Sequence, residues 1–126
     1  MAYPTLDVSR EGPFVSVALN RPEVRNALNG QVIADLHDWA HEVRTMDGVR
    51  VVVVSGHGAS FCAGADAAWM AQAVHQSDEE NRQEAERVGA MLTALDTLPI
   101  PVIGRVHGAA LGGGADRKST RLNSSH

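Results

Sequence analysis

Residues 49–55 read Val-Arg-Val-Val-Val-Val-Ser, a run that is almost entirely apolar and β-branched. Such a run is typical of a central strand in a sheet that other elements cover on both faces. A second run of this kind spans residues 101–106. Apolar residues recur at helical spacing before and between them, over residues 32–43 and 85–95. The alternation of strand and helix predicts an α/β fold with a sheet covered by helices.

Two shorter strands precede these elements. Residues 5–10 alternate weakly between apolar and polar side chains, and residues 14–19 are rich in apolar and β-branched ones. Glu11-Gly12-Pro13 between them is a sequence typical of turns, so a hairpin is expected. Residues 20–29 form a polar loop in which Pro22 prevents a helix.

Capping residues predict where the helices begin and end. The first long helix should end near Asp47-Gly48. A short helix should begin at Asp66, and Ser77 with Glu80 forms a capping-box pattern ahead of a longer helix. Pro99 and Pro101 should stop that helix, because proline cannot continue the helical hydrogen bonds.

Composition limits the partners. The 126 residues suffice for one modest domain, and the net charge of −4 gives no reason to expect nucleic acid. No apolar run approaches the roughly 20 residues that span a bilayer, and residues 1–4 lack a signal-peptide pattern. We therefore expect a cytoplasmic protein with no membrane partner. Cys62 is the only cysteine, which favours a packed small side chain over a thiol nucleophile.

Two loops of small residues follow predicted strands, residues 61–66 (Phe-Cys-Ala-Gly-Ala-Asp) and 108–114 (Gly-Ala-Ala-Leu-Gly-Gly-Gly). Glycine and alanine let another group approach the backbone closely. Backbone N–H groups at a helix start are ready donors to negative charge. One donor from each loop could bind a single oxyanion, which is a catalytic arrangement.

Other chemistries lack their sequence signatures. No His/Cys or carboxylate cluster stands at metal-ligand spacing, no Gly-x-Ser-x-Gly occurs, and no Walker lysine follows the glycines. The glycine run does not fit Gly-x-Gly-x-x-Gly, although a nucleotide-binding α/β domain stays open as an alternative. Histidines are interpreted as structural at positions 57 and 107, and as exposed on helices at His37, His41 and His75.

In their order and spacing, four segments resemble the N-terminal part of the crotonase, or enoyl-CoA hydratase/isomerase, family. They are Leu19–Pro22 with Asn26–Leu28, Val51–Ser55, Phe61–Asp66, and Pro101–Ile103 through Gly112–Gly114. The resemblance implies a crotonase-like (ClpP/crotonase) spiral of ββα units, cut before its C-terminal helices. Residues 65–70 and 95–99 look similar to the methylglutaconyl-CoA hydratase-like branch.

The resemblance also implies the site. The backbone N–H groups of Ala65 and Gly113 would form an oxyanion hole for a thioester enolate. Coenzyme A, which belongs to the substrate and leaves no separate cofactor, would contact Ala63, Ala65, Asp66, Ala67 and Gly112. Arg25 would meet a CoA phosphate or else be a surface arginine, and Asp66 would be mainly a helix N-cap.

The activity implied is enoyl-CoA hydration in fatty acid or branched-chain amino acid breakdown, by a homotrimer or homohexamer. Isomerase chemistry, or acyl-CoA binding without catalysis, are the alternatives. Family hydratases use two glutamates. The first falls at Asp116 here, where we do not carry the role over, and the second would lie beyond the chain.

The last segment, residues 116–126, differs in composition from the rest. It turns to Ser, Thr and Asn, holds the only lysine, Lys118, and matches the translation of a sequencing adapter. We therefore expect residues 1–115 to be the N-terminal part of the core domain and residues 116–126 to be non-native. Such a fragment should be inactive and should expose apolar faces.

Overall fold

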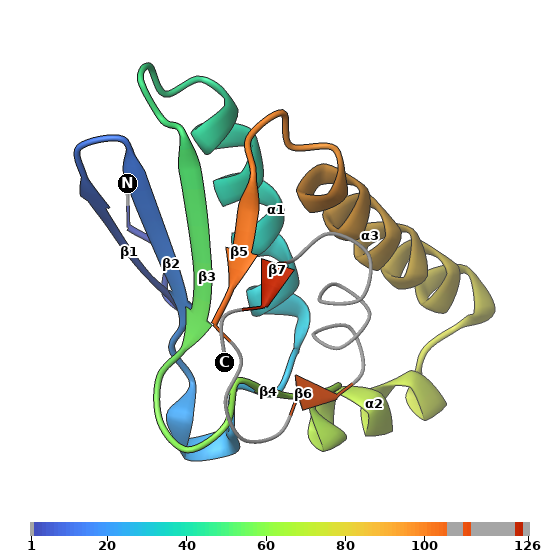
Figure 1. Ribbon diagram of the computed structural model, residues 1–126. Helices are drawn as coiled ribbons and strands as arrows, with labels where there is room; N and C mark the ends of the chain where they lie inside the picture. The colour runs from blue at the N-terminus through green and yellow to red at the C-terminus, as the bar shows by residue number, and fades with distance from the viewer. Residues whose placement is uncertain (1, 106–109, 112–122, 125–126) are drawn as a thin grey trace.

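A computed structural model describes residues 2–105, 110–111 and 123–124 of the chain. Its main sheet has five strands in the order β1-β2-β3-β5-β7 (Figure 1). β1 is antiparallel to β2, and the other neighbours are parallel. The predicted hairpin and the central place of the valine-rich strand are confirmed. The strands are β1 (Leu6–Glu11), β2 (Phe14–Leu19), β3 (Val51–Gly56), β5 (Val102–Gly104) and β7 (Asn123–Ser124).

A second, two-stranded sheet joins the two small-residue loops. Its strands are parallel, with Cys62 opposite Ala110 and Ala63 opposite Leu111. In Figure 1 this sheet lies beyond one end of the main sheet, next to α2. The strands are β4 (Cys62–Ala63) and β6 (Ala110–Leu111), and the helices are η1 (Pro22–Val24), α1 (Gly30–Arg44), α2 (Ala67–Gln72), η2 (Ala73–His75) and α3 (Asp78–Asp96).

Helix α1 packs its apolar face on the sheet. Its buried residues include Val32, Leu36 and Trp39, which the helical spacing predicts. Asn29 caps its start, where the side chain accepts a hydrogen bond from the N–H of Val32. The helix ends at Arg44, three residues before the predicted end, because the N–H and hydroxyl of Thr45 bond back to the carbonyl oxygen of Glu42.

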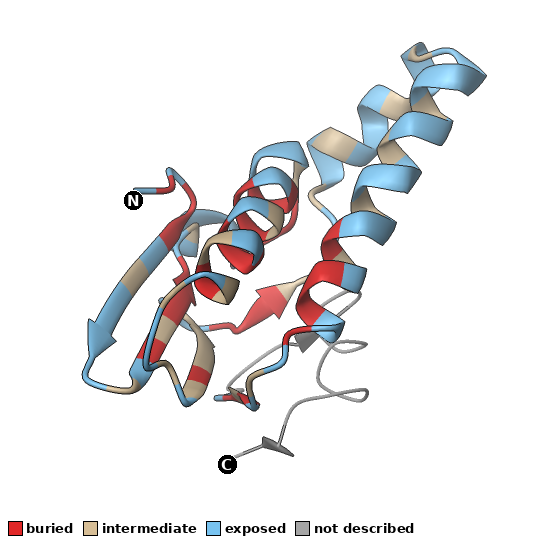
Figure 2. Cartoon of the chain, turned by 90° about the horizontal axis from the view of Figure 1, so that it is seen from above, coloured by how far each residue is buried: buried red, intermediate tan, exposed pale blue. Residues whose placement is uncertain are grey.

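Helix α3 begins with the predicted capping box. The Ser77 hydroxyl accepts from the N–H of Glu80, whose carboxylate accepts from the N–H of Ser77. Only its last turns are buried, and the exposed N-terminal half projects away from the sheet (Figure 2). Arg44 of α1 holds the C-terminal end of α3 in place. Its Nη2 donates to the carbonyl oxygen of Ala94 and to the hydroxyl of Thr97.

The core lies between the main sheet, α1 and the C-terminal part of α3. Cys62 is completely buried in it, as the packed-side-chain interpretation predicts. Within the described ranges, no helix has both the length and the apolar character that crossing a bilayer requires. Residues 123–124 pair with β5. This pairing does not test where residues 116–126 come from, so their non-native origin stays a prediction.

Candidate functional site

The polar loop 20–29 is organised by Asn26. Its side chain is buried, donates to the carbonyl oxygens of His57 and Ser60 at 2.9 Å each, and accepts from the N–H of Arg21 at 2.8 Å. The backbone of Asn26 is left-handed, with φ 58°, a conformation that asparagine tolerates better than most residues. One side chain therefore fixes both the shape of this loop and its distance from the loop that follows β3.

Residues 25–28 serve as a backbone template for residues 63–66. The N–H of Ala63 donates to the Arg25 carbonyl oxygen at 3.0 Å. Leu28 then makes two hydrogen bonds of 2.7 Å. Its N–H donates to the carbonyl oxygen of Gly64, and its own carbonyl oxygen accepts from the N–H of Asp66. These are main-chain bonds, so they hold the first small-residue loop in place whatever side chains it carries.

The template fixes the direction of the Ala65 amide. Ala65 forms a parallel bridge with Leu28, and the two bonds of that bridge use Gly64 and Asp66. In an extended segment, neighbouring residues direct their backbone groups to opposite sides, so the N–H of Ala65 points away from Leu28. Among the described residues nothing accepts a hydrogen bond from it. Ala65 is also exposed, so the residue that carries this amide lies at the surface.

Asp66 is the N-cap of α2, as predicted. Its Oδ1 accepts from the N–H of Trp69 at 3.0 Å, and its Oδ2 lies 3.2 Å from Nη2 of Arg21. The Trp69 hydrogen bond, with the Arg21 guanidinium, lowers the pKa of this carboxyl from its ordinary value, although partial desolvation opposes them. Both carboxylate oxygens are thus engaged within the protein, which favours a structural role.

The other predicted site residues lie around this loop or outside the described residues. Arg25 is exposed with φ 55°, and its carbonyl oxygen meets Ala63. Ala67 is exposed at the first position of α2. Gly112 and Gly113 lie outside the described residues, as do Asp116 and His107. The structure therefore brings Arg25, Ala63 and Ala65 together, while the second loop is represented by β6 alone.

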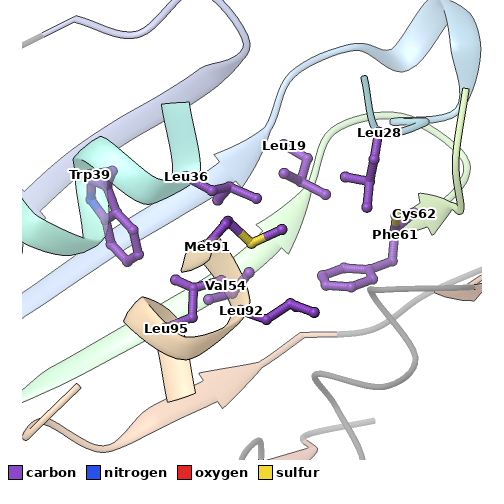
Figure 3. Close-up of a pocket in the computed structure, with 10 residues that line it drawn as sticks. All are labelled: Leu19, Leu28, Leu36, Trp39, Val54, Phe61, Cys62, Met91, Leu92 and Leu95. Carbon is purple, nitrogen blue, oxygen red and sulfur yellow. The ribbon is translucent and has the colours of Figure 1, made fainter. Parts of the chain in front are cut away.

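An apolar cavity of about 50 Å³ lies behind the first loop. Phe61 and Cys62, which lead into the loop, line it together with Leu28 (Figure 3). The opposite wall comes from α1 and α3, and Figure 3 shows the Phe61 ring near Leu92 of α3. Apart from the Cys62 thiol, the Met91 thioether and the Trp39 indole, only hydrocarbon side chains surround this space, so the loop rests on a surface of low polarity.

Sequence reasoning missed two organising residues, Arg21 and Asn26, which it placed in a polar loop without a role. The guanidinium of Arg21 bridges the carbonyl oxygen of Ala27, at 2.5 Å, and the Asp66 carboxylate. The neighbouring Pro22, which begins η1, was the available signal, because a rigid turn next to two polar residues indicates a defined loop. A further link joins Nε1 of Trp69 to Glu84 of α3 at 2.9 Å.

Among the described residues, no histidine ring hydrogen-bonds to residues 63–66. His57 lies at the end of β3, where its Nε2 is 2.8 Å from the Asp7 carboxylate and its carbonyl oxygen accepts from Asn26. In the part of the chain that the structure describes, no three His, Cys, Asp or Glu side chains are grouped around a common point that could hold a metal ion.

Comparison with known proteins gives one consistent result. The family model described as "Enoyl-CoA hydratase/isomerase" matches residues 10–119. The protein named "Probable enoyl-CoA hydratase echA6" of Mycobacterium leprae is 37% identical over 112 residues, which are 86% of this chain and 42% of that protein. The "Crotonyl-CoA hydratase" of Syntrophomonas wolfei is 32% identical over 117 residues, 92% of this chain and 44% of that protein.

Solved structures agree with the sequence relatives. A Mycobacterium smegmatis enoyl-CoA hydratase matches 96% of this chain and 47% of its own, with a TM-score of 0.86 and 31% identity. An enoyl-CoA hydratase from Shewanella pealeana has a TM-score of 0.91 at 24% identity, over 95% of this chain and 45% of that one, and supports the fold. The chain spans less than half the length of these proteins.

Proposed function

Because the chain belongs to the enoyl-CoA hydratase/isomerase family, we propose that the full-length protein binds an acyl-CoA thioester and stabilises the enolate that forms at its carbonyl. The reaction we favour is addition of water to a 2-enoyl-CoA. Family membership also sets aside the nucleotide-binding alternative that the glycine run left open. Coenzyme A belongs to the substrate in this reaction, so the proposal needs no separate cofactor.

The orientation of the Ala65 amide is the observation that carries this proposal. An enolate oxygen gains negative charge during the reaction, and a fixed N–H that already points at it stabilises that charge without reorganising. The template from Arg25 to Leu28 supplies the required rigidity. The apolar cavity lined by Phe61 and Cys62 lies behind the loop, and low polarity strengthens such an interaction.

Gly113 is the proposed second donor. The pairing of Ala63 with Leu111 supports it, because Ala65 and Gly113 each follow a member of that pair by two residues. For coenzyme A we propose contacts to Arg25, Ala63, Ala65, Asp66, Ala67 and Gly112. The exposure of Arg25 and Ala67 and the bond from Ala63 to Arg25 support one continuous binding surface, with Asp66 contributing mainly by holding α2.

Proton transfer distinguishes hydratases from isomerases, and both reactions occur among the names of the relatives. A mitochondrial rat protein named "Delta(3,5)-Delta(2,4)-dienoyl-CoA isomerase" is 32% identical over 123 residues, 90% of this chain and 38% of that protein. We favour hydration, in fatty acid breakdown or, if the methylglutaconyl-CoA prediction holds, branched-chain amino acid breakdown. We also propose a cytoplasmic homotrimer or homohexamer.

The test uses the full-length protein encoded by the uninterrupted gene. Turnover of crotonyl-CoA is followed by loss of the enoyl-thioester absorbance, and binding by titration with acetoacetyl-CoA and, separately, with NAD. Ala65→Pro removes the donor while leaving the Gly64 and Asp66 bonds to Leu28 available, so we expect a loss of about 10²–10³ in kcat. Ala65→Ser keeps the amide and should change kcat far less.

Two results would overturn the proposal. Full activity in Ala65→Pro would show that Ala65 is not an oxyanion donor. Binding of NAD without binding of acyl-CoA would rule out the proposed function. Binding of acetoacetyl-CoA without turnover of any enoyl-CoA would instead identify an acyl-CoA-binding protein that lacks catalysis. Comparing crotonyl-CoA with methylglutaconyl-CoA then tests the substrate branch.

A further inference from the structure

Helix α1 carries two histidines on its outer side, one turn apart. His37 and His41 stand at positions i and i+4, which lie next to each other on a helix surface. His41 is exposed and the His37 side chain is 38% exposed, while the opposite side of the helix is buried against the core. Solvent therefore reaches both rings, and neither belongs to the site around Ala65.

The two rings converge through their Nε2 atoms, which lie 3.3 Å apart. The ring centroids are 4.6 Å apart and the ring planes meet at 65°. A Zn²⁺ ion binds imidazole nitrogen at about 2.0–2.1 Å. Two nitrogens 3.3 Å apart can both lie at that distance from one ion, with an angle of about 104–111° at the metal. That angle is close to the tetrahedral value.

The charges around the pair are mixed. The Asp38 carboxylate is 3.7 Å from Nδ1 of His37, so an acidic group lies beside the ring nitrogen that does not face His41. Arg87 of α3 lines the same surface hollow as His37 and Asp38, and so brings a positive charge to that side of the pair. Glu42, next to His41, accepts a hydrogen bond from the Tyr3 hydroxyl.

We propose that His37 and His41 form a two-histidine site for a borderline divalent transition metal, with Zn²⁺, Ni²⁺ and Cu²⁺ as the chemical class. Without metal, one Nε2 donates its proton to the other. On binding, the donor ring gives up its Nε2 proton to solvent and takes one up at Nδ1, so that each ring carries its proton on Nδ1 and both Nε2 lone pairs are available to the ion. Water fills the remaining positions, because within the described ranges no third His, Cys, Asp or Glu joins the pair.

The ligand chemistry makes the site selective. Neutral imidazole suits Zn²⁺, Ni²⁺ and Cu²⁺, whereas Mg²⁺ and Ca²⁺ prefer oxygen ligands. The proposal departs from the expectation, drawn from the sequence, that the chain holds no metal site. That expectation rested on clusters of several ligands and did not weigh a single pair at helical spacing.

The experiment uses the 126-residue chain without an affinity tag and needs no enzymatic activity. Isothermal titration with ZnCl₂ and with NiCl₂, each against MgCl₂, measures the affinity and stoichiometry. The variants His37→Gln and His41→Gln each remove one ligand at a solvent-accessible helix position. His75→Asn is the matched control, because it removes an exposed histidine from η2 and leaves the pair intact.

We expect one saturable Zn²⁺ site whose affinity falls at least tenfold in each single Gln variant and is unchanged in His75→Asn. Losses of this size are typical even for residues that only support a ligand. Added Zn²⁺ should also raise the melting temperature of the wild type and not that of the double variant. Wild-type affinity in the double variant, loss of affinity in His75→Asn, or equal binding of Mg²⁺ would overturn the proposal. Circular dichroism in EDTA confirms that each variant is folded.

Discussion

Arg21 and Asp66, 45 residues apart in the sequence, meet through a 3.2 Å contact between Nη2 and Oδ2. The same guanidinium donates to the carbonyl oxygen of Ala27. Arg21 therefore links the template segment to the start of α2, with Ala65 held between these two attachments. The pair acts on the proposed oxyanion donor by positioning it, since neither side chain replaces the amide itself.

Arg21→Met should lower kcat of the full-length enzyme while changing KM less. It removes both attachments and lets the Ala65 amide drift, and small misplacements of a catalytic group cost about 10- to 100-fold. Steady-state kinetics with crotonyl-CoA measures this. Arg21→Lys should recover part of the rate, and the exposed Arg50→Met is the control. Unchanged kcat in Arg21→Met would show that the contact has no influence on the donor.

The stabilising contribution of Asp66 should disappear in acid. The folded-state pKa of this carboxyl lies below its ordinary value of 3.8. Its charged form therefore stabilises the fold above the unfolded pKa, and the contribution is lost as pH falls through the folded value. Asp66→Asn keeps a capping oxygen but does not titrate. The difference in unfolding midpoint between wild type and Asp66→Asn should thus be largest near neutrality and should shrink as the pH falls through the folded-state pKa of Asp66. A difference that is independent of pH would contradict this assignment.

Asn26→Ala should destabilise the chain by about 3 kcal/mol. It leaves the carbonyl oxygens of His57 and Ser60 and the N–H of Arg21 without their partner in buried or partly buried places. It also puts alanine in a left-handed conformation. Urea denaturation measures the change. Asn20→Ala, at an exposed position of the same loop, should shift the midpoint little, and equal effects of both substitutions would refute a special role for Asn26.

Replacing two glycines by alanine should change the stability of the fold in opposite directions. A Cβ at Gly56 would lie 2.6 Å from the Phe61 carbonyl oxygen and 2.8 Å from Nδ2 of Asn26, so Gly56→Ala should cost about 1–3 kcal/mol. A Cβ at Gly89, inside α3, would have no atom within 4 Å. Gly89→Ala should therefore raise the free energy of unfolding by about 0.5–1 kcal/mol, because alanine has the higher helix propensity. Thermal melts of the two variants provide the comparison. Similar melting temperatures would mean that the close approach at Gly56 is relieved at no cost.

Local patterns predicted the elements well. The valine run became the central strand β3, Glu11-Gly12-Pro13 closed a hairpin, and Ser77 with Glu80 capped α3, because each depends on residues close together in the sequence. The contacts that organise the candidate site were not predicted. Arg21 reaches Asp66, and Asn26 reaches Ser60, across 34 to 45 residues. Periodicity and capping rules describe neighbours along the chain and contain no information on such pairs.

The backbone template between residues 25–28 and 63–66 has an evolutionary consequence. Its bonds join main-chain groups, so a substitution at Ala63 or Ala65 alters the shape and polarity that a ligand meets without turning the amide away. Under the proposed function, substrate preference can thus diverge while the proposed charge-stabilising geometry is inherited unchanged. Relatives that share about a third of their residues with this chain would then need to keep only the main-chain pairing at these positions, and not the side chains.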